Sequence, residues 1–241
     1  MKLLKTGVPG LDEIFRGGIN EKSSVLVTGA PGTGKTILAM QFLIEGAKRN
    51  EPGIYITTDE DLDSIREYMK SFSFDKNLQK YEKKGMVTLL KQSVSAKKLV
   101  SIAAPLEIIK KNKVKRVVLD SLSLFEYTCP TKEDFRREVM DFIARMREAG
   151  VTLLVTSERE TVNLDELKYK PQDFLFQGLV ILTKIRKGSS FERCVHVAKM
   201  RGQNVLLDVY PFNIDKNGIN VFPNQLPFSL IEKDIREGKG K

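Results

Sequence analysis

Val25-Leu26-Val27-Thr28-Gly29-Ala30-Pro31-Gly32-Thr33-Gly34-Lys35-Thr36 is the stretch of sequence that decides the fold. Residues 29–36 match the pattern G-x-x-x-x-G-K-[ST], and they stand between a short apolar run and a segment whose apolar residues have helical spacing. This order of strand, loop and helix is the context that the pattern requires. We therefore predict a Walker A phosphate loop, whose backbone N–H groups turn inward around a phosphate at the positive end of a helix.

Each residue of the loop has a predicted role. The backbone around the β-phosphate is expected to come from Gly29, Ala30, Pro31, Gly32, Thr33 and Gly34. Lys35 should bridge the β- and γ-phosphates, and the Thr36 hydroxyl should ligate Mg²⁺. Asp120 directly follows the apolar run at residues 117–119, which is the placement of a Walker B acid that reaches the magnesium ion through water. The predicted cofactors are ATP and Mg²⁺.

Two further carboxylates, Asp59 and Glu60, follow the apolar run at residues 54–57. This position would bring them to the sheet edge where nucleotide binds, and one of them could orient the attacking water. The alternative is that they belong, with Asp61 and Asp63, to an acidic helix start that interacts with the helix dipole.

The unit of strand followed by helix recurs along the chain. Apolar runs predict strands at residues 53–57, 86–90, 114–119 and 151–156, and helical spacing predicts helices at 62–72, 97–112 and 133–149. This alternation predicts a three-layer α/β fold with a mainly parallel central sheet. The pattern then changes to two C-terminal β-hairpins, at residues 178–201 and 206–222. Without a break in composition, we expect one domain over residues 1–241.

The formal net charge of +9 is unevenly distributed. Residues 76–116 hold twelve Lys/Arg and two acids, which indicates either a surface for DNA or an acidic partner, or a pair of solvated, lysine-rich helix faces. Cys129, Cys194 and His196 are too few for a disulfide framework or a Cys/His metal cluster, so we expect inert thiols. No apolar run is long enough for a signal peptide or a membrane span, which favours a soluble, cytoplasmic protein without a membrane partner.

A set of short motifs extends the argument beyond the phosphate loop. These motifs are Thr6-Gly7-Val8-Pro9-Gly10-Leu11-Asp12-Glu13, Gly17-Gly18, Gln41-Phe42-Leu43, Thr57-Thr58-Asp59-Glu60, Val118-Leu119-Asp120-Ser121 and Lys199-Met200-Arg201-Gly202. In this order, and together with the loop, they resemble the KaiC-like members of the RecA/RadA ATPases. The resemblance extends to about Pro223.

The resemblance implies a RecA-like homo-oligomer, a ring (of hexameric type) or a filament, with ATP at the subunit interfaces. Lys199 and Arg201 match the cationic fingers that one subunit offers to its neighbour's γ-phosphate. Spaced at i and i+2, they would share one face of a strand; the alternative is that they are exposed charges on a hairpin edge. Ser157 and Glu158 resemble the family's sensor position beside the γ-phosphate.

Three departures from the family pattern limit what the resemblance implies. The paired glutamates of the family appear as Asp59-Glu60, whose shorter Asp favours slow hydrolysis. The usual Asp-Gly before the late strand is Gln177-Gly178. Asp173-Phe174 stand where clock members carry the phosphorylated Ser-Thr pair, so we do not expect a timekeeping autokinase.

The expected function is an ATPase whose nucleotide state controls assembly or a partner. One hypothesis is a DNA recombination or repair accessory that binds DNA through residues 76–116. The alternative is a nucleotide-switched signalling or scaffold protein that binds a protein partner and turns over little ATP. A phosphate loop also serves small-molecule kinases, but the finger motif gives no reason to choose that class.

Overall fold

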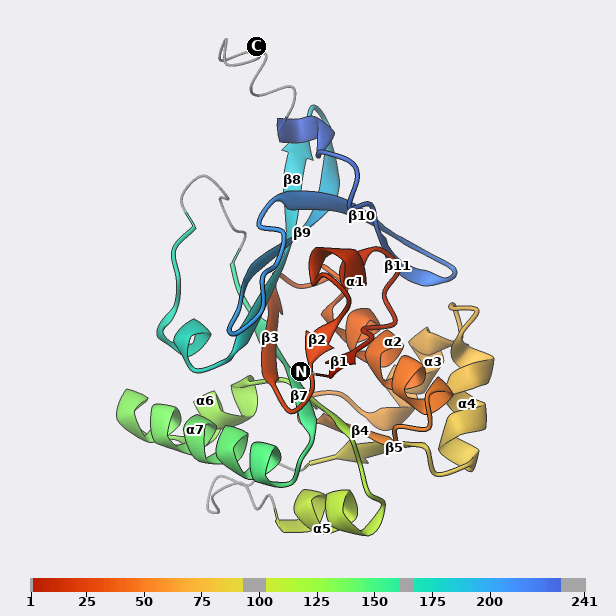
Figure 1. Ribbon diagram of the computed structural model, residues 1–241, viewed down its shortest axis with the longest axis vertical. Coiled ribbons are helices and arrows are strands. Elements are labelled where there is room, and N and C mark those ends of the chain that lie inside the picture. Colours follow the sequence, from red (N-terminus) through yellow and green to blue (C-terminus); the bar gives the residue numbers. More distant parts are fainter. Residues whose placement is uncertain (1, 93–102, 161–166, 231–241) are drawn as a thin grey trace.

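A nine-stranded sheet forms the centre of the molecule. The computed structural model describes residues 2–92, 103–160 and 167–230 (Figure 1). The strands of the sheet are β3 (Ser24–Gly29), β4 (Gly53–Thr57), β5 (Val87–Lys91), β6 (Arg116–Asp120), β7 (Thr152–Glu158), β8 (Gly178–Lys187), β9 (Ser190–Met200), β10 (Val209–Asp215) and β11 (Gly218–Val221). Their spatial order is β11-β10-β9-β8-β3-β7-β6-β4-β5. The half from β8 to β5 is parallel and the half from β11 to β8 is antiparallel, which confirms the mainly parallel sheet and the two hairpins.

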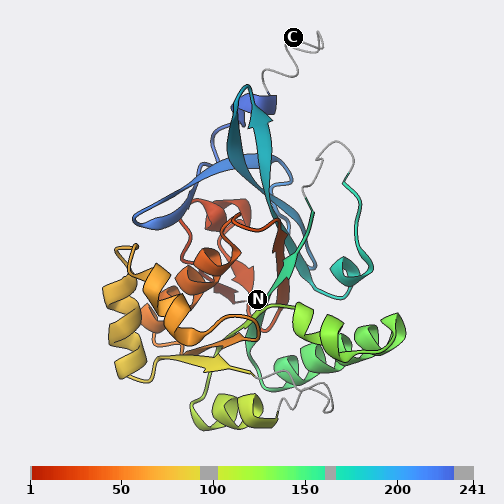
Figure 2. The same cartoon turned by 180° about the vertical axis from the view of Figure 1, so that it is seen from behind.

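Helices cover both faces of this sheet. The helices are α1 (Leu11–Ile14), α2 (Lys35–Lys48), α3 (Leu62–Met69), α4 (Asp75–Lys83), α5 (Ala103–Lys111), α6 (Ser123–Thr128) and α7 (Lys132–Glu148). One apolar cluster joins α2, α3 and α4 to the sheet and to the hairpin β10–β11, and a second cluster joins α5, α6 and α7 to the other face. Figure 2 shows the same two layers from behind. The predicted three-layer α/β fold is therefore confirmed.

Some short elements were not predicted. They are α1, α4, α6, the two-stranded pair β1 (Leu3–Leu4) and β2 (Ile19–Asn20), and the 3₁₀ helix η2 (Pro171–Phe174). Helix α4 is strongly polar and buries only Leu78, so it offers no apolar period to recognise. Of the helix predicted at 97–112, residues 97–102 lie outside the described part of the chain, and α5 occupies most of the rest.

The β8–β9 ladder contains a register shift that affects the position of the predicted fingers. Leu179 pairs with Lys199, whereas Val180 pairs with Val197, so Ala198 is the extra residue of a bulge. Val197 belongs to the apolar cluster around α2, and Leu179, opposite Lys199, belongs to the cluster around α7. The bulge therefore turns Lys199 toward the α7 face of the sheet.

Arg116 corrects part of the predicted basic surface, because its side chain is completely buried. The guanidinium donates to the Glu51 carboxylate at 2.6 and 2.9 Å, to the Lys5 carbonyl oxygen at 2.7 Å and to the Phe42 carbonyl oxygen at 2.8 Å. Burial lowers the pKa of Arg116, and the bond to Glu51 opposes this shift. Arg116 thus ties the N-terminal segment to α2 and is withdrawn from any partner surface.

Two smaller points concern the surface and the ends of the chain. The charged segment after residue 230 lies outside the described residues. In the part that is described, every helix is too short or too polar to cross a bilayer.

Candidate functional site

The phosphate loop joins β3 to α2 in a conformation that requires glycine. Gly32 has φ 71° and Gly34 has φ 104°, in the left-handed region that L side chains rarely adopt. A Cβ on Gly34 would also lie 3.0 Å from Ile214 Cδ1 of the hairpin β10–β11. The helix begins at Lys35 directly after this glycine, so its free N–H groups face the loop.

Lys35 is held at the mouth of the loop. Its side chain is 9% exposed, and Nζ donates to the Gly29 carbonyl oxygen at 2.9 Å and to the Ala30 carbonyl oxygen at 3.3 Å. The same ammonium lies 3.1 Å from the Glu158 carboxylate, which comes from the end of β7. A phosphate entering the loop would take over the position of this carboxylate as the anion next to Lys35.

The Asp120 carboxylate lies below the loop and accepts three hydrogen bonds. The Thr36 hydroxyl donates to Oδ2 at 2.9 Å, the Tyr55 hydroxyl donates to Oδ2 at 2.5 Å, and the Thr156 hydroxyl donates to Oδ1. Burial, followed by the charge of Asp120, raises the pKa of Tyr55, so this phenol stays protonated and remains a donor. A hydroxyl and a carboxylate in contact are oxygen ligands of the kind that Mg²⁺ prefers.

Asp59 and Glu60 lie at the same edge of the sheet. Asp59 Oδ2 accepts hydrogen bonds from the Ser121 hydroxyl at 3.2 Å and from the Ser123 hydroxyl at 2.9 Å. Glu60 Oε2 accepts one from the Tyr68 hydroxyl at 3.0 Å. The N-cap of α3 is Asp61, so Asp59 and Glu60 lie directly before the first helical turn.

These groups line one cavity of about 720 Å³ at the carboxyl ends of β3, β4 and β6. Its size is within the usual range for small-molecule sites. Among its walls are Gly32, Gly34, Lys35, Thr36, Asp59, Glu60, Tyr68, Asp120, Tyr127, Glu158, Arg193 and Ile214. The structure therefore brings together the predicted loop, the predicted metal ligands and the predicted water-orienting acids.

Comparison with known proteins agrees with this site. The family model described as "ATPase: KaiC" matches residues 4–226. The chain belongs to the KaiC ATPase family. Membership indicates an ATP-binding protein with a RecA-like ATPase domain. Members of this family typically bind ATP together with Mg²⁺, and they commonly form rings.

Relatives of known sequence include two circadian clock oscillator proteins KaiC. That of Parathermosynechococcus lividus is 34% identical over 229 residues, which cover 91% of this chain and 42% of that protein. That of Parasynechococcus marenigrum is 32% identical over 91% of this chain and 44% of that protein. The chain thus spans less than half the length of these KaiC proteins.

A solved structure supports the fold over most of the chain. The crystal structure of a KaiC-like protein from Pyrococcus horikoshii superposes with a TM-score of 0.79 and 32% sequence identity, covering 92% of this chain and 99% of that one. The predicted KaiC-like, RecA-like fold is therefore confirmed.

Lys199 and Arg201, the finger residues expected from the KaiC resemblance, lie together but away from the cavity. Lys199 Nζ is 5.8 Å from the centroid of the Phe174 ring, and Arg201 Nη2 donates to the Phe174 carbonyl oxygen at 3.1 Å. Strand β9 ends at Met200, so Arg201 lies in the following turn rather than on the strand. We call Phe174, Lys199 and Arg201 the finger platform.

The finger platform is at the opposite end of β3 from the phosphate loop. Gly178, which pairs with Met200, lies beside Val25, whereas the loop follows Gly29. Four residues of a strand span about 13 Å, and the bulge places Lys199 on the other face of the sheet. The platform therefore does not contact the phosphate loop of its own chain.

The positions that depart from the KaiC pattern have structural partners. Gln177 Oε1 accepts from the Ser24 backbone N–H at 3.1 Å, next to the platform. Asp173 is buried, forms an ion pair with Arg159, and accepts from the Lys170 backbone N–H at 2.8 Å. Asp173 thus fixes η2, which carries Phe174.

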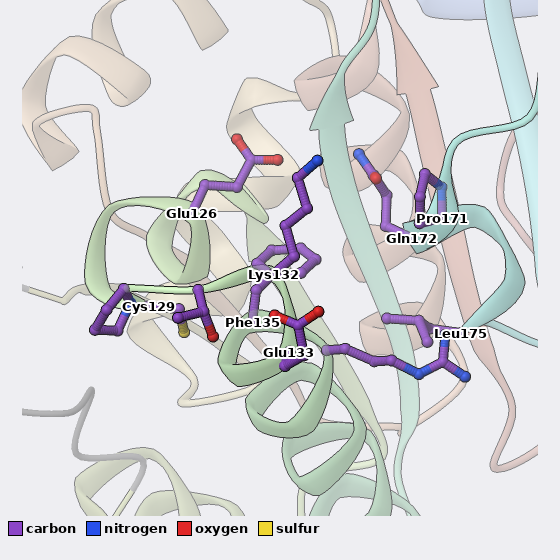
Figure 3. A pocket seen from close by; sticks show the side chains of 11 residues that line it. Glu126, Cys129, Lys132, Glu133, Phe135, Pro171, Gln172 and Leu175 are labelled. Atoms are coloured by element: carbon purple, nitrogen blue, oxygen red, sulfur yellow. The ribbon is translucent and has the colours of Figure 1, made fainter.

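A second cavity of about 510 Å³ lies between the α6–α7 junction and η2 (Figure 3). Its walls are Glu126, Cys129, Pro130, Thr131, Lys132, Glu133, Phe135, Arg136, Pro171, Gln172 and Leu175. None of the nucleotide-site residues predicted from the sequence lines it. Since η2 forms one wall and also carries Phe174, this cavity borders the support of the finger platform.

Several site residues were not predicted from the sequence. The Asp120 carboxylate accepts hydrogen bonds from Tyr55 and Thr156, and the Glu60 carboxylate accepts one from Tyr68. Arg193 of β9 lines the same cavity. Tyr55 lies between two buried apolar residues of β4, and Thr156 follows a buried apolar run in β7, so neither side chain is a strong signal in the sequence. Arg193 shares β9 with Lys199, but nothing in its local sequence distinguishes it.

Proposed function

We propose that residues 1–241 form a single ATPase domain that binds ATP with Mg²⁺ and hydrolyses it at the subunit interfaces of a cytoplasmic homo-oligomer, a hexameric ring or a filament. The observation that carries the proposal is the contact of the Thr36 hydroxyl with Asp120 at 2.9 Å, directly beside Lys35. This arrangement matches a phosphate cradle with a cation site at its base. When bound there, Mg²⁺ would neutralise charge on the β- and γ-phosphates.

The residues of this chain would share the work of phosphoryl transfer to water. The loop and Lys35 bind and orient the polyphosphate, and Thr36 and Asp120 hold the cation. Asp59 and Glu60 extend into the same cavity, where either carboxylate can accept a proton from water and hold it in line. Glu60 is fixed by Tyr68, and Asp59 by two serines, so both carboxylates are oriented before substrate binds.

The position of the finger platform supports the proposal that hydrolysis takes place between subunits. Lys199 and Arg201 lie at the opposite end of β3 from their own loop, too far to contact its phosphates. Phe174, which both cations contact, is exposed, and so is Arg201. Two cations that approach a neighbouring γ-phosphate would stabilise the charge of the transition state. We propose that each platform completes the site of the next subunit.

Calorimetry with Mg²⁺ATP tests the central claim. Lys35→Ala should abolish measurable ATP affinity, because it removes the cation at the loop mouth, and Thr36→Ala should weaken affinity chiefly when Mg²⁺ is present. Lys48→Ala, on the exposed end of α2, is the matched control and should bind as the parent protein does. ATP binding by Lys35→Ala at parental affinity would refute the proposal.

The biological output has two candidates. A DNA recombination or repair role is favoured by exposed lysines on α4 and at the end of α5, namely Lys76, Lys80, Lys83, Lys84, Lys110, Lys111, Lys113 and Lys115. The expected non-specific affinity is about 10⁻⁴ to 10⁻⁶ M and falls steeply with salt. The alternative is a nucleotide-switched scaffold that binds a protein partner. Gel shifts of single- and double-stranded DNA, at low salt and with ATP present, distinguish these two candidates. The absence of a shift would favour the scaffold.

A further inference from the structure

Arg193 is a charged side chain in the nucleotide cavity for which the family resemblance provided no role. It lines the cavity together with Gly32, Gly34 and Lys35. Its Nε atom is buried and, among the described residues, has no acceptor. A buried donor on a charged group is costly to leave unpaired, so an anion in this cavity would satisfy it.

The register of β8 and β9 explains why Arg193 points to this cavity. Leu182 pairs with Val195, and both belong to the apolar cluster on the α2 face. Lys184 pairs with Arg193, one alternation further along the ladder, so these two side chains stand on the same face. That face carries the phosphate loop, and Gly29 lies beside Leu182 in the adjacent strand.

Lys184 makes the same place more positive. Its Nζ lies 3.5 Å from the position that a Cβ would take on Gly32, at the outer turn of the loop. Two neighbouring cations would repel each other in the empty site, and a polyanion between them would relieve this repulsion. The polyphosphate chain of a nucleotide is a ligand of that kind.

We propose, on the basis of the proposed function, that Arg193 binds the polyphosphate of the nucleotide held by its own subunit, with Lys184 as a weaker second cation. Arg193 acts in cis, in contrast to Lys199 and Arg201. The nucleotide is then enclosed by cations on three sides: Lys35 from α2, Arg193 from β9, and the platform of the next subunit.

The test is the affinity of Arg193→Gln for Mg²⁺ATP and for inorganic tripolyphosphate, measured beside the parent. Loss of a charge-assisted hydrogen bond should weaken both ligands by about tenfold or more. Arg193→Lys should recover part of the loss, and Lys184→Gln should show a smaller one. The control is Arg186→Gln, which removes an exposed arginine further along β8 and should change nothing.

Each contrary result has a definite meaning. Parental affinity of Arg193→Gln, with ATP binding by the parent intact, would overturn the proposal and leave the proposed function standing. Weaker ATP binding with unchanged tripolyphosphate binding would show that Arg193 contacts the sugar or base of the nucleotide and not its polyphosphate. The measurement is repeated above and below the concentration at which the chain assembles. The same loss at both supports a role in cis, and a loss only in the assembled protein would assign Arg193 to the neighbour. No ATP binding by the parent would instead refute the proposed function itself.

Discussion

The charged groups at the two ends of β3 differ in whether they have partners in their own chain. At the carboxyl end, Lys35 and the carboxylates beside it have partners in their own chain: Lys35 contacts Glu158, Asp120 accepts three hydrogen bonds, and Glu60 accepts one from Tyr68. At the amino end, the finger platform exposes 56% of Phe174, and no ion pair between described residues includes Lys199 or Arg201.

This difference indicates which end can act alone and which end requires a further ligand. The loop end is organised before nucleotide arrives, so it can bind without help. The platform end carries two cations that have no carboxylate partner among the described residues, and burial followed by the charge of Arg201 lowers the pKa of Lys199. An anion at the platform would relieve both effects. We therefore expect binding to depend on the loop end of β3 alone and turnover to depend on both ends.

The largest expected effect is on turnover at the platform end. Arg201→Ala should reduce hydrolysis by about 10³-fold or more, by analogy with other arginine fingers, and leave ATP affinity unchanged. Activity per subunit should rise with protein concentration as the oligomer forms. Steady-state hydrolysis over a dilution series, with calorimetry beside it, checks both statements.

A mixing experiment separates the two ends further. Lys35→Ala protein has intact fingers and a broken loop, and Arg201→Ala protein has the reverse. A mixture should regain activity that neither protein has alone. Absence of rescue, together with activity that is independent of concentration, would show that the site is completed within one chain.

The next effect concerns the acids at the loop end. Glu60→Gln and Asp59→Asn should leave ATP bound, while at least one slows turnover by about 10²-fold or more, the range for losing a positioned general base. Single-turnover rates measured at saturating ATP test this. If neither variant nor the double variant slows turnover, these acids only shape the start of α3.

A smaller effect is expected for Tyr55→Phe, which removes one donor to Asp120. A hydrogen bond to a charged group contributes about 1.5–3 kcal/mol, so the Mg²⁺ concentration needed for half-maximal ATP binding should rise about tenfold. Binding without Mg²⁺ should not change. Tyr210→Phe is the control, because its hydroxyl donates to Asp208 at 3.1 Å and Tyr210 does not line the nucleotide cavity. Equal Mg²⁺ dependence in parent and Tyr55→Phe would mean that Asp120 does not need this donor.

The smallest effect is expected for Glu158→Gln. This change removes the carboxylate next to Lys35 and should raise ATP affinity by a few-fold, since the loop end would lose an internal competitor for its cation. Competition titrations with a fluorescent ATP analogue can resolve such a change. Weaker binding would instead identify Glu158 as a contributor to the nucleotide site.

The sequence predicted the loop end well, since its signal is local. The glycine spacing, Lys35 and Thr36 lie in one short segment, and periodic apolar runs predicted the strands that bring Asp120 and Asp59 beside it. The donors Tyr55 and Thr156 could not be predicted, because their role depends on the order of β4, β6 and β7 in the sheet.

The platform end shows where local patterns fail. Lys199 and Arg201 were expected on one face of a strand through simple alternation. They do meet, but through the bulge at Ala198 and the turn after Met200, which no apolar pattern marks. The local charge pattern predicts that Arg116 belongs to a basic surface, whereas its hydrogen bonds to Lys5, Phe42 and Glu51, distant in sequence, hold it in the interior.

Strand β9 carries, on the assignments proposed above, a contact to two different nucleotides. Arg193 serves the subunit's own ATP, and Lys199, six residues later, serves the neighbour's. Between these residues β9 is hydrogen-bonded to β8, and at residues 194–196 also to β10, so the segment acts as a rod of about 20 Å with a nucleotide contact at each end. A shift of this rod along its axis that tightens one contact must displace the other by the same amount. In a closed ring, these strands would couple the nucleotide contacts of neighbouring active sites without any hinge.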